Sequence, residues 1–182
     1  MNIVPIAYNT YRESIRDKIL YVILLFSLMM IMSSILLSSL SLGQNEKVIV
    51  DLGLASISIF GVLLTMFIGT NLLNKEIDKK TIYLLLTKPL RRSEFILGKH
   101  IGLSLTLLVI VTMMSATFYG LIWFTTGNTP LIYLQAILLN YVELVLLVSL
   151  AILFSTIASP IMSSIYTLAV YIIGHFSKDL LN

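Results

Sequence analysis

The sequence predicts an all-α integral membrane protein, a helical bundle of five transmembrane spans within one domain, residues 1–182. Three observations carry this prediction. Apolar residues make up 58% of the chain and charged residues 12%, against about half and about a quarter in soluble domains. Long runs without charge recur, each near the ~20 residues that cross a hydrocarbon core. Much of the charge lies in one internal polar stretch, residues 74–99.

The first segment, residues 2–18, predicts an amphipathic helix lying in the headgroup region of the membrane. An ordinary basic flank is the alternative interpretation. Apolar and aromatic side chains fall on one helical face and polar ones on the other: Tyr8, Tyr11, Ile15 and Ile19 against Asn9, Arg12, Glu13, Arg16 and Asp17. The uncharged run 19–42 then predicts the first span, because it is longer than the apolar region of a signal peptide.

The middle of the chain predicts two further spans. A polar turn is expected at residues 41–51, followed by the second span at 52–73. Pro89 ends any helix that begins near Lys75, since proline lacks an N–H and clashes with the preceding turn. Ser93 can cap a new helix that runs unbroken into the third span, residues 101–124.

The last apolar region predicts two spans joined by a turn. Residues 131–177 would form a helix about 70 Å long, more than twice a hydrocarbon core of about 30 Å. The chain must therefore fold back, and Ser159 and Pro160 mark the expected place. This gives a fourth span at 131–157 and a fifth at 161–177.

The distribution of Lys and Arg orients these spans. With a cytoplasmic amino terminus, ten of the twelve basic residues face the cytoplasm and only Lys47 and Lys178 face the other side, as the positive-inside rule requires. The net charge of +3 is explained by this placement, so no nucleic-acid partner is expected. The chain has no cysteine, which excludes disulfides and thiolate metal sites.

The polar stretch 74–99 joins the second and third spans on the cytoplasmic side. A group of charges that ends at Lys80 precedes five apolar residues, 82–86. These five are too few to span and need cover by lipid, by the chain's own helices or by a partner protein. A short helix held by a span at each end can act as a lever that tilts both spans.

This stretch resembles the cytoplasmic loop of ABC type-2 transporter permeases, in particular those associated with multicopper enzyme maturation. The matching positions are an acid, a Thr-Ile pair, a Leu-rich turn, a Lys-Pro, an Arg and a Gly-Lys: Glu76, Thr81-Ile82, Leu84-Leu85-Leu86, Lys88-Pro89, Arg92 and Gly98-Lys99. Lys80 stands where the family commonly has Gly. The family has six spans, so the resemblance implies that a sixth span is missing and that the chain is a carboxyl-terminal truncation.

The resemblance implies a cytoplasmic coupling helix that docks on a separate ABC ATPase subunit. The residues that would make this contact are Glu76, Ile77, Thr81, Ile82, Leu85, Lys88, Pro89, Arg91 and Arg92. No Gly-rich loop ending in Gly-Lys-Ser or Gly-Lys-Thr occurs in this chain, so ATP and Mg²⁺ are expected on the partner and no cofactor here.

The resemblance further implies an exporter permease, not an enzyme, that pairs with a second permease copy in the lipid bilayer of a bacterial or archaeal cytoplasmic membrane. The alternative function, from another class, is a small membrane interaction or immunity-type protein without transport activity. An ATPase encoded beside this chain would favour the permease.

Two polar residues lie inside the predicted fourth span. Glu143 is the one acid deep in a span, and Asn140 lies one turn away on the same face. They could contact substrate along its path, or could hold helices together. His100 and His175 fall near opposite membrane faces, so no metal site is expected.

Overall fold

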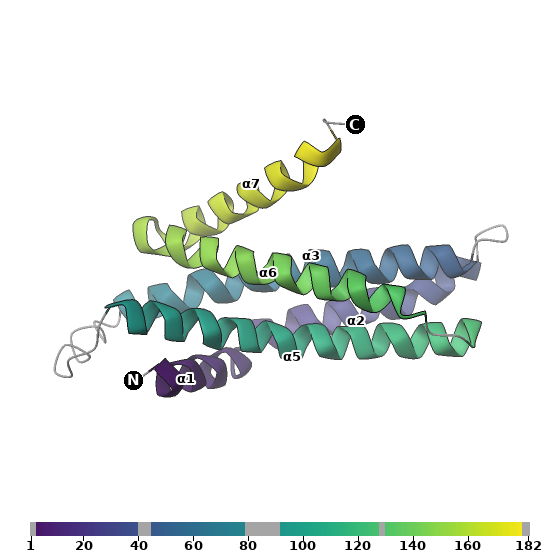
Figure 1. Ribbon diagram of the computed structural model, residues 1–182, viewed down its shortest axis with the longest axis horizontal. Coiled ribbons are helices and arrows are strands. Elements are labelled where there is room, and N and C mark those ends of the chain that lie inside the picture. The colour runs from purple at the N-terminus through teal and green to yellow at the C-terminus, as the bar shows by residue number, and fades with distance from the viewer. Residues whose placement is uncertain (1–2, 40–44, 79–91, 128–129, 180–182) are drawn as a thin grey trace.

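The computed structural model of the chain describes residues 3–39, 45–78, 92–127 and 130–179, and they form helices and turns without a strand (Figure 1). The helices are α1 (Ile3–Ile15), α2 (Lys18–Ser39), α3 (Asn45–Asp78), α5 (Arg92–Thr126), α6 (Ile132–Ile157) and α7 (Pro160–Asp179). The long helices α2, α3, α5 and α6 form one bundle, in which successive helices run in opposite directions (Figure 1). The end that carries α1, the last turns of α3 and the first turns of α5 is called the α1 end below.

Four of the described helices are long and apolar enough to cross a membrane, which confirms four of the five predicted spans. They are Lys18–Ser38, Glu46–Thr70, Ser93–Thr126 and Ile132–Ile157. The fifth predicted span falls on the apolar helical segment Pro160–Phe176, which is shorter than these four. A five-span count therefore stays a prediction.

The predicted boundaries hold at two places and fail at one. Helix α5 runs unbroken from Arg92 to Thr126, and the fold-back lies at Ala158–Ser159, with Pro160 opening α7. Proline suits the first helical turn, where no N–H bond is lost. The polar turn predicted at 41–51 is wrong in its second half, because α3 begins at Asn45. Glu46 lies in the first turn of α3, where a negative charge favours the helix.

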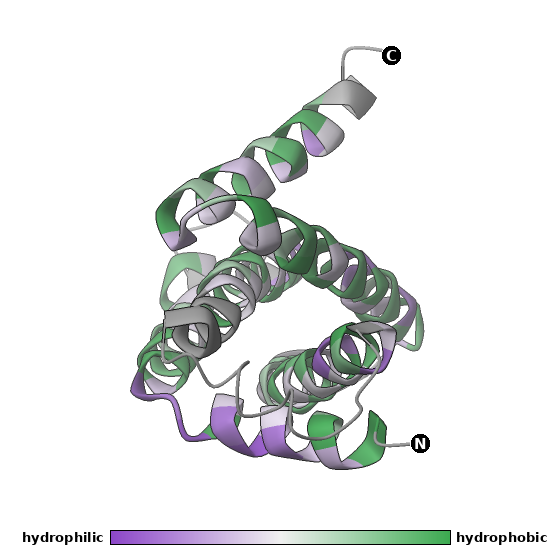
Figure 2. Ribbon diagram, turned by 90° about the vertical axis from the view of Figure 1, so that its left-hand side faces the viewer, coloured by the Kyte–Doolittle hydropathy of each residue, from purple (hydrophilic) through white to green (hydrophobic). Residues whose placement is uncertain are grey.

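The core of the bundle lies between α3, α5 and α6. Its largest fully buried apolar side chains include Ile57, Leu64, Met114, Phe118 and Leu144. Many large apolar side chains on the outer faces are exposed instead, such as Phe124 and Ile157 at 83% and 80%. Such a surface suits hydrocarbon, where no hydrophobic force opposes exposure. Figure 2 shows the bundle helices as mostly hydrophobic, with hydrophilic residues gathered on α1.

Glycines on α3 allow close packing in this core. A Cβ on Gly61 would lie 2.6 Å from Leu144 Cδ1, and one on Gly69 would lie 3.0 Å from Ala151 Cβ. A Cβ on Gly53 would overlap the Phe118 ring. Gly53 faces α5, whereas Gly61 and Gly69 face α6, so both neighbours approach the backbone of α3 closely. Packing of small residues is a main source of helix association in lipid.

Candidate functional site

The expected coupling segment is framed by the two longest helices of the bundle. Helix α3 ends at Asp78 and α5 begins at Arg92, both at the α1 end (Figure 1). At a rise of about 1.5 Å per residue each helix is about 50 Å long, against a hydrocarbon core of about 30 Å. Both helices are therefore long enough to project beyond a membrane.

Most of the predicted coupling residues lie outside the described residues: Thr81, Ile82, Leu85, Lys88, Pro89 and Arg91. Glu76 and Ile77 lie in the last turns of α3, and Arg92 is the first residue of α5. The structure thus places three of the nine residues on the two helices that flank the segment, and the contacts predicted for all nine remain predictions.

Helix α1 packs tightly against the first turns of α5. A Cβ on Gly98 would lie 2.7 Å from Ile6 Cγ2, and one on Gly102 would lie 2.6 Å from the backbone oxygen of Ala7. On α1 the buried residues are the small ones, Ala7, Thr10 and Ser14. Small side chains on both helices therefore bring the two backbones together.

The hydroxyl groups in this contact are satisfied within α1. Thr10 donates to the Ile6 carbonyl at 2.9 Å, and Ser14 donates to the Thr10 carbonyl at 2.8 Å. These two buried hydroxyls therefore need no partner on α5, and the close fit of small side chains and glycines is what brings the helices together. On the apolar face predicted for this segment, Tyr8 is 64% exposed, whereas Tyr11 and Ile15 are half-buried. Tyr8 is therefore available to lipid.

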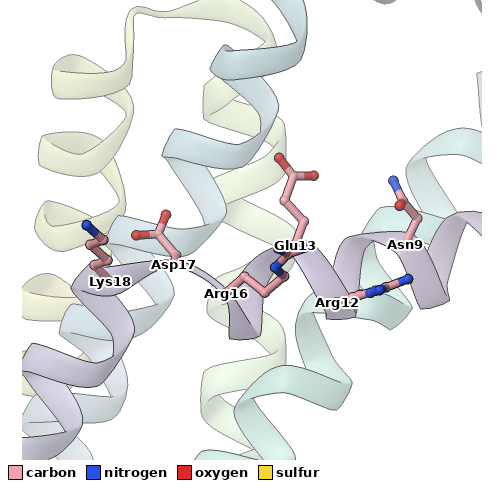
Figure 3. Close-up of a pocket in the computed structure, with 6 residues that line it drawn as sticks. All are labelled: Asn9, Arg12, Glu13, Arg16, Asp17 and Lys18. Atoms are coloured by element: carbon pink, nitrogen blue, oxygen red, sulfur yellow. The ribbon is translucent and has the colours of Figure 1, made fainter.

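The junction of α1 and α2 is a charged corner. Asp17 accepts the backbone N–H of Ile19 at 3.1 Å and so caps α2. A hollow of about 720 Å³ at this corner is lined by Asn9, Arg12, Glu13, Arg16, Asp17 and Lys18. Figure 3 shows Glu13 and Asp17 pointing to the same side, with Lys18 beside Asp17. The mixed charges are suited to the zwitterionic region of a membrane.

A groove opens between α3, α6 and α7 on another side of the bundle. Its volume is about 780 Å³, and its walls are mainly Leu, Ile, Val and Ala side chains. Glu143 and Asn140 both line it, so the structure brings together the two residues singled out within the fourth span. Glu143 is exposed, and none of the described residues forms a hydrogen bond or ion pair with it. The expected role as glue within one chain therefore finds no partner among those residues.

The two histidines line different hollows. His175 lines the groove, where its ring stacks on Tyr171 with centroids 5.7 Å apart. His100 lines a smaller hollow of about 370 Å³ between α5 and α6, with Ser104 and Tyr141. Among the described residues no three His, Asp or Glu side chains gather in a way that could hold a metal ion.

Comparison with protein families matches residues 4–179 to the ABC-2 family of transporter proteins. The match covers nearly the whole chain, from α1 to the end of α7. The chain belongs to the ABC-2 transporter family. It is thus a multi-pass membrane permease of the ABC transport type, and this membership implies association with an ABC ATPase. Comparison with curated proteins gives no match.

Two features of this ABC-2 permease leave no trace in the pattern of charge and hydropathy. One is the set of glycines that admits close neighbours: Gly53, Gly61, Gly69, Gly98 and Gly102. The spacing of four residues between Gly98 and Gly102 on α5 is a readable signal of helix contact. The other is the polar lining that α3 and α7 add to the groove, Ser58, Tyr171 and His175. These residues are far apart in sequence, and no local pattern joins them.

Proposed function

We propose that this ABC-2 permease is an exporter subunit, driven by a separate cytoplasmic ATPase that binds residues 74–92 between α3 and α5. The observation that carries the proposal is the family match over residues 4–179 together with this charged segment between two long helices. The ATPase binds ATP and Mg²⁺, and the permease provides the path. No catalytic residue is assigned to this chain.

The length of α5 supports a mechanical role. This helix is unbroken from Arg92 to Thr126, so a force applied at its first turn reaches the far end of the bundle. Helix α3 receives the same force at Asp78, because it flanks the same segment. Closure of the ATPase then tilts two helices that share the core with α6.

The contact between α1 and α5 extends this movement to the amino terminus. Gly98 and Gly102 lie within three turns of Arg92, and their contact with α1 has no spare room. Helix α1 therefore moves with α5 as one unit. Under the proposed orientation, this unit lies at the cytoplasmic surface, where the polar face of α1 meets headgroups.

Co-purification tests the proposal. A tagged permease is isolated in mild detergent from cells that express the neighbouring ATPase, and the bound ATPase is quantified. Glu76→Lys reverses a charge at the end of α3 that flanks the segment and should reduce the bound ATPase by about tenfold, a size typical of a lost interface charge pair. Glu46→Lys is the matched control, because it makes the same change at the opposite end of the same helix.

The outcome is decisive in both directions. Equal ATPase recovery with Glu76→Lys and with the unaltered chain would contradict the coupling role of this segment. Loss with both variants would point to misfolding, which melting curves of the two purified proteins would detect. The second permease copy is tested on the same samples, since native mass spectrometry should show complexes that contain two permease chains.

Export is tested separately from ATPase binding. Inverted and right-side-out vesicles that carry the complete complex are incubated in labelled substrate, with ATP supplied on the side of the membrane that carries the ATPase. ATP-driven accumulation inside inverted vesicles is the expected result for an exporter, whereas accumulation in right-side-out vesicles would assign import.

A further inference from the structure

The groove between α3, α6 and α7 owes its opening to the direction of α7. At its first turns α7 is held to both neighbours: Ser163 donates to the Ala151 carbonyl of α6 at 3.4 Å, and Ser164 shares a hydrogen bond of 3.0 Å with Thr70 of α3. Beyond these contacts α7 leaves the bundle at an angle (Figures 1 and 2). The space left behind is about 780 Å³, within the range of small-molecule sites.

Two polar groups of the groove, a carboxylate and an amide oxygen, have no hydrogen-bond donor among the described residues. Glu143 and Asn140 lie one turn apart on α6, and the Asn140 Oδ1 atom is buried without a hydrogen-bond partner among the described residues. Ser58 and Tyr171 share a hydrogen bond of 3.3 Å and so satisfy each other. The residues described as lining the groove include no lysine or arginine.

Glu143 lies deep enough for its charge to matter. It is eleven residues after Ile132, the first residue of α6, which is about 16 Å along a helix of about 39 Å. An acid at such a depth is costly in lipid and marks a site that expects a counter-charge or water. The unpaired Asn140 oxygen likewise requires a donor, because a buried acceptor without one is destabilising.

We propose that this groove binds a hydrophobic organic cation with an ammonium group. The ammonium pairs with the Glu143 carboxylate and donates an N–H to Asn140 Oδ1, while the apolar body lies against the Leu, Ile and Val walls. The stacked rings of Tyr171 and His175 offer an aromatic surface to the cation or to a flat apolar body. Whether such a cation is also the exported substrate rests on the proposed function, but its binding does not.

A pair of fluorescent probes tests the binding. Dansylcadaverine carries a primary ammonium, and its N-acetyl derivative has the same fluorophore without the charge. Each is titrated into the purified permease in lipid nanodiscs, with no ATPase present. The ammonium probe should bind saturably, and the neutral probe should bind about tenfold more weakly or worse, as expected when one member of a desolvated charge pair is removed.

Variants assign the binding to the groove. Glu143→Gln should weaken the ammonium probe by about tenfold or more and leave the neutral probe unchanged. Asn140→Ala should weaken the ammonium probe by a smaller factor. Asp51→Asn is the matched control, since it removes an exposed carboxylate of α3 that does not line the groove, and it should bind both probes like the unaltered chain. Melting curves establish that each variant is folded, and Asn140→Ala serves if Glu143→Gln is not.

Three results would overturn the inference. The first is equal binding of both probes, and the second is equal binding of the ammonium probe by Glu143→Gln and by the unaltered chain. The third is that the unaltered chain binds no probe while Glu143→Gln loses the permease dimer, which would make the groove an interface between copies. Failure here with normal ATPase co-purification would leave the coupling proposal intact. Probe binding by a chain with which no ATPase co-purifies would support the cation site and contradict the coupling proposal.

Discussion

Two glycine-containing helix pairs in this permease meet in opposite ways. Where α1 crosses α5, a Cβ on Gly102 would lie 2.6 Å from the Ala7 backbone oxygen. Where α7 passes α6, a Cβ on Gly174 would meet no atom within 4 Å, although Gly174 lines the groove. Between α1 and α5, glycine allows close packing. Between α6 and α7, glycine adds to an open space. The closed contact suits a part that transmits force, and the open one suits a part that receives a ligand.

Gly102→Ala should give the largest loss of stability. Its methyl group meets backbone, which cannot turn aside like a flexible side chain, so α1 must move away from α5. Overpacking of this kind costs about 1 to 3 kcal/mol. The measurement is thermal or denaturant unfolding in detergent, with protease cleavage of α1 as a local probe. Unchanged stability with α1 still protected would contradict the close contact.

Gly61→Ala should cost less, about 1 kcal/mol, at the lower end of the overpacking range. Its Cβ would lie 2.6 Å from Leu144 Cδ1, but a leucine side chain can change rotamer. The double variant Gly61→Ala/Leu144→Ala is informative, because the smaller residue removes the clash. If the two substitutions simply add their costs, the proposed steric conflict between them is absent.

Ser164→Ala tests what holds the first turns of α7. The variant loses the hydrogen bond to Thr70, and such bonds between membrane helices average about 0.6 kcal/mol. Ser149→Ala is the control, because the one bond of the Ser149 hydroxyl to a described residue is to the Val145 carbonyl of its own helix. Unfolding in detergent should separate the two variants. A larger cost for Ser149→Ala would contradict the role of the α3–α7 bond.

Gly174→Ala should have the smallest effect, within about 0.5 kcal/mol of zero, as for substitutions that disturb no packing. The comparison between the two helix pairs then reduces to one experiment, since the same substitution is made at Gly102 and at Gly174. Similar losses at both positions would show that the groove is filled in the folded protein, by lipid or by a second copy.

Sequence patterns predicted the long helices because uncharged runs report directly on the hydrocarbon core. They also predicted the fold-back at Pro160 and the unbroken course of α5 past Ser93. They failed at the start of α3, where charged residues were interpreted as a turn although Glu46 favours a helix amino terminus.

Within the candidate site, only contacts along one helix could be read from the sequence. Glu143 and Asn140 share a face of α6 by spacing alone, and the structure places both in the groove. Ser58, Tyr171 and His175 reach the same groove only because α3 and α7 fold beside α6. The face of α1 that packs on α5 is selected by side-chain size, which a pattern of hydropathy does not indicate.

The course of α5 has a consequence for how two faces of a membrane can be linked. If a rigid helix of about 50 Å tilts about a point near its middle, its two ends move in opposite directions. Arg92 and Thr126 are those ends. A push on one surface would then become a displacement on the other through the tilt of a single helix. One break in that helix, such as a proline near Val109, would disconnect the two surfaces.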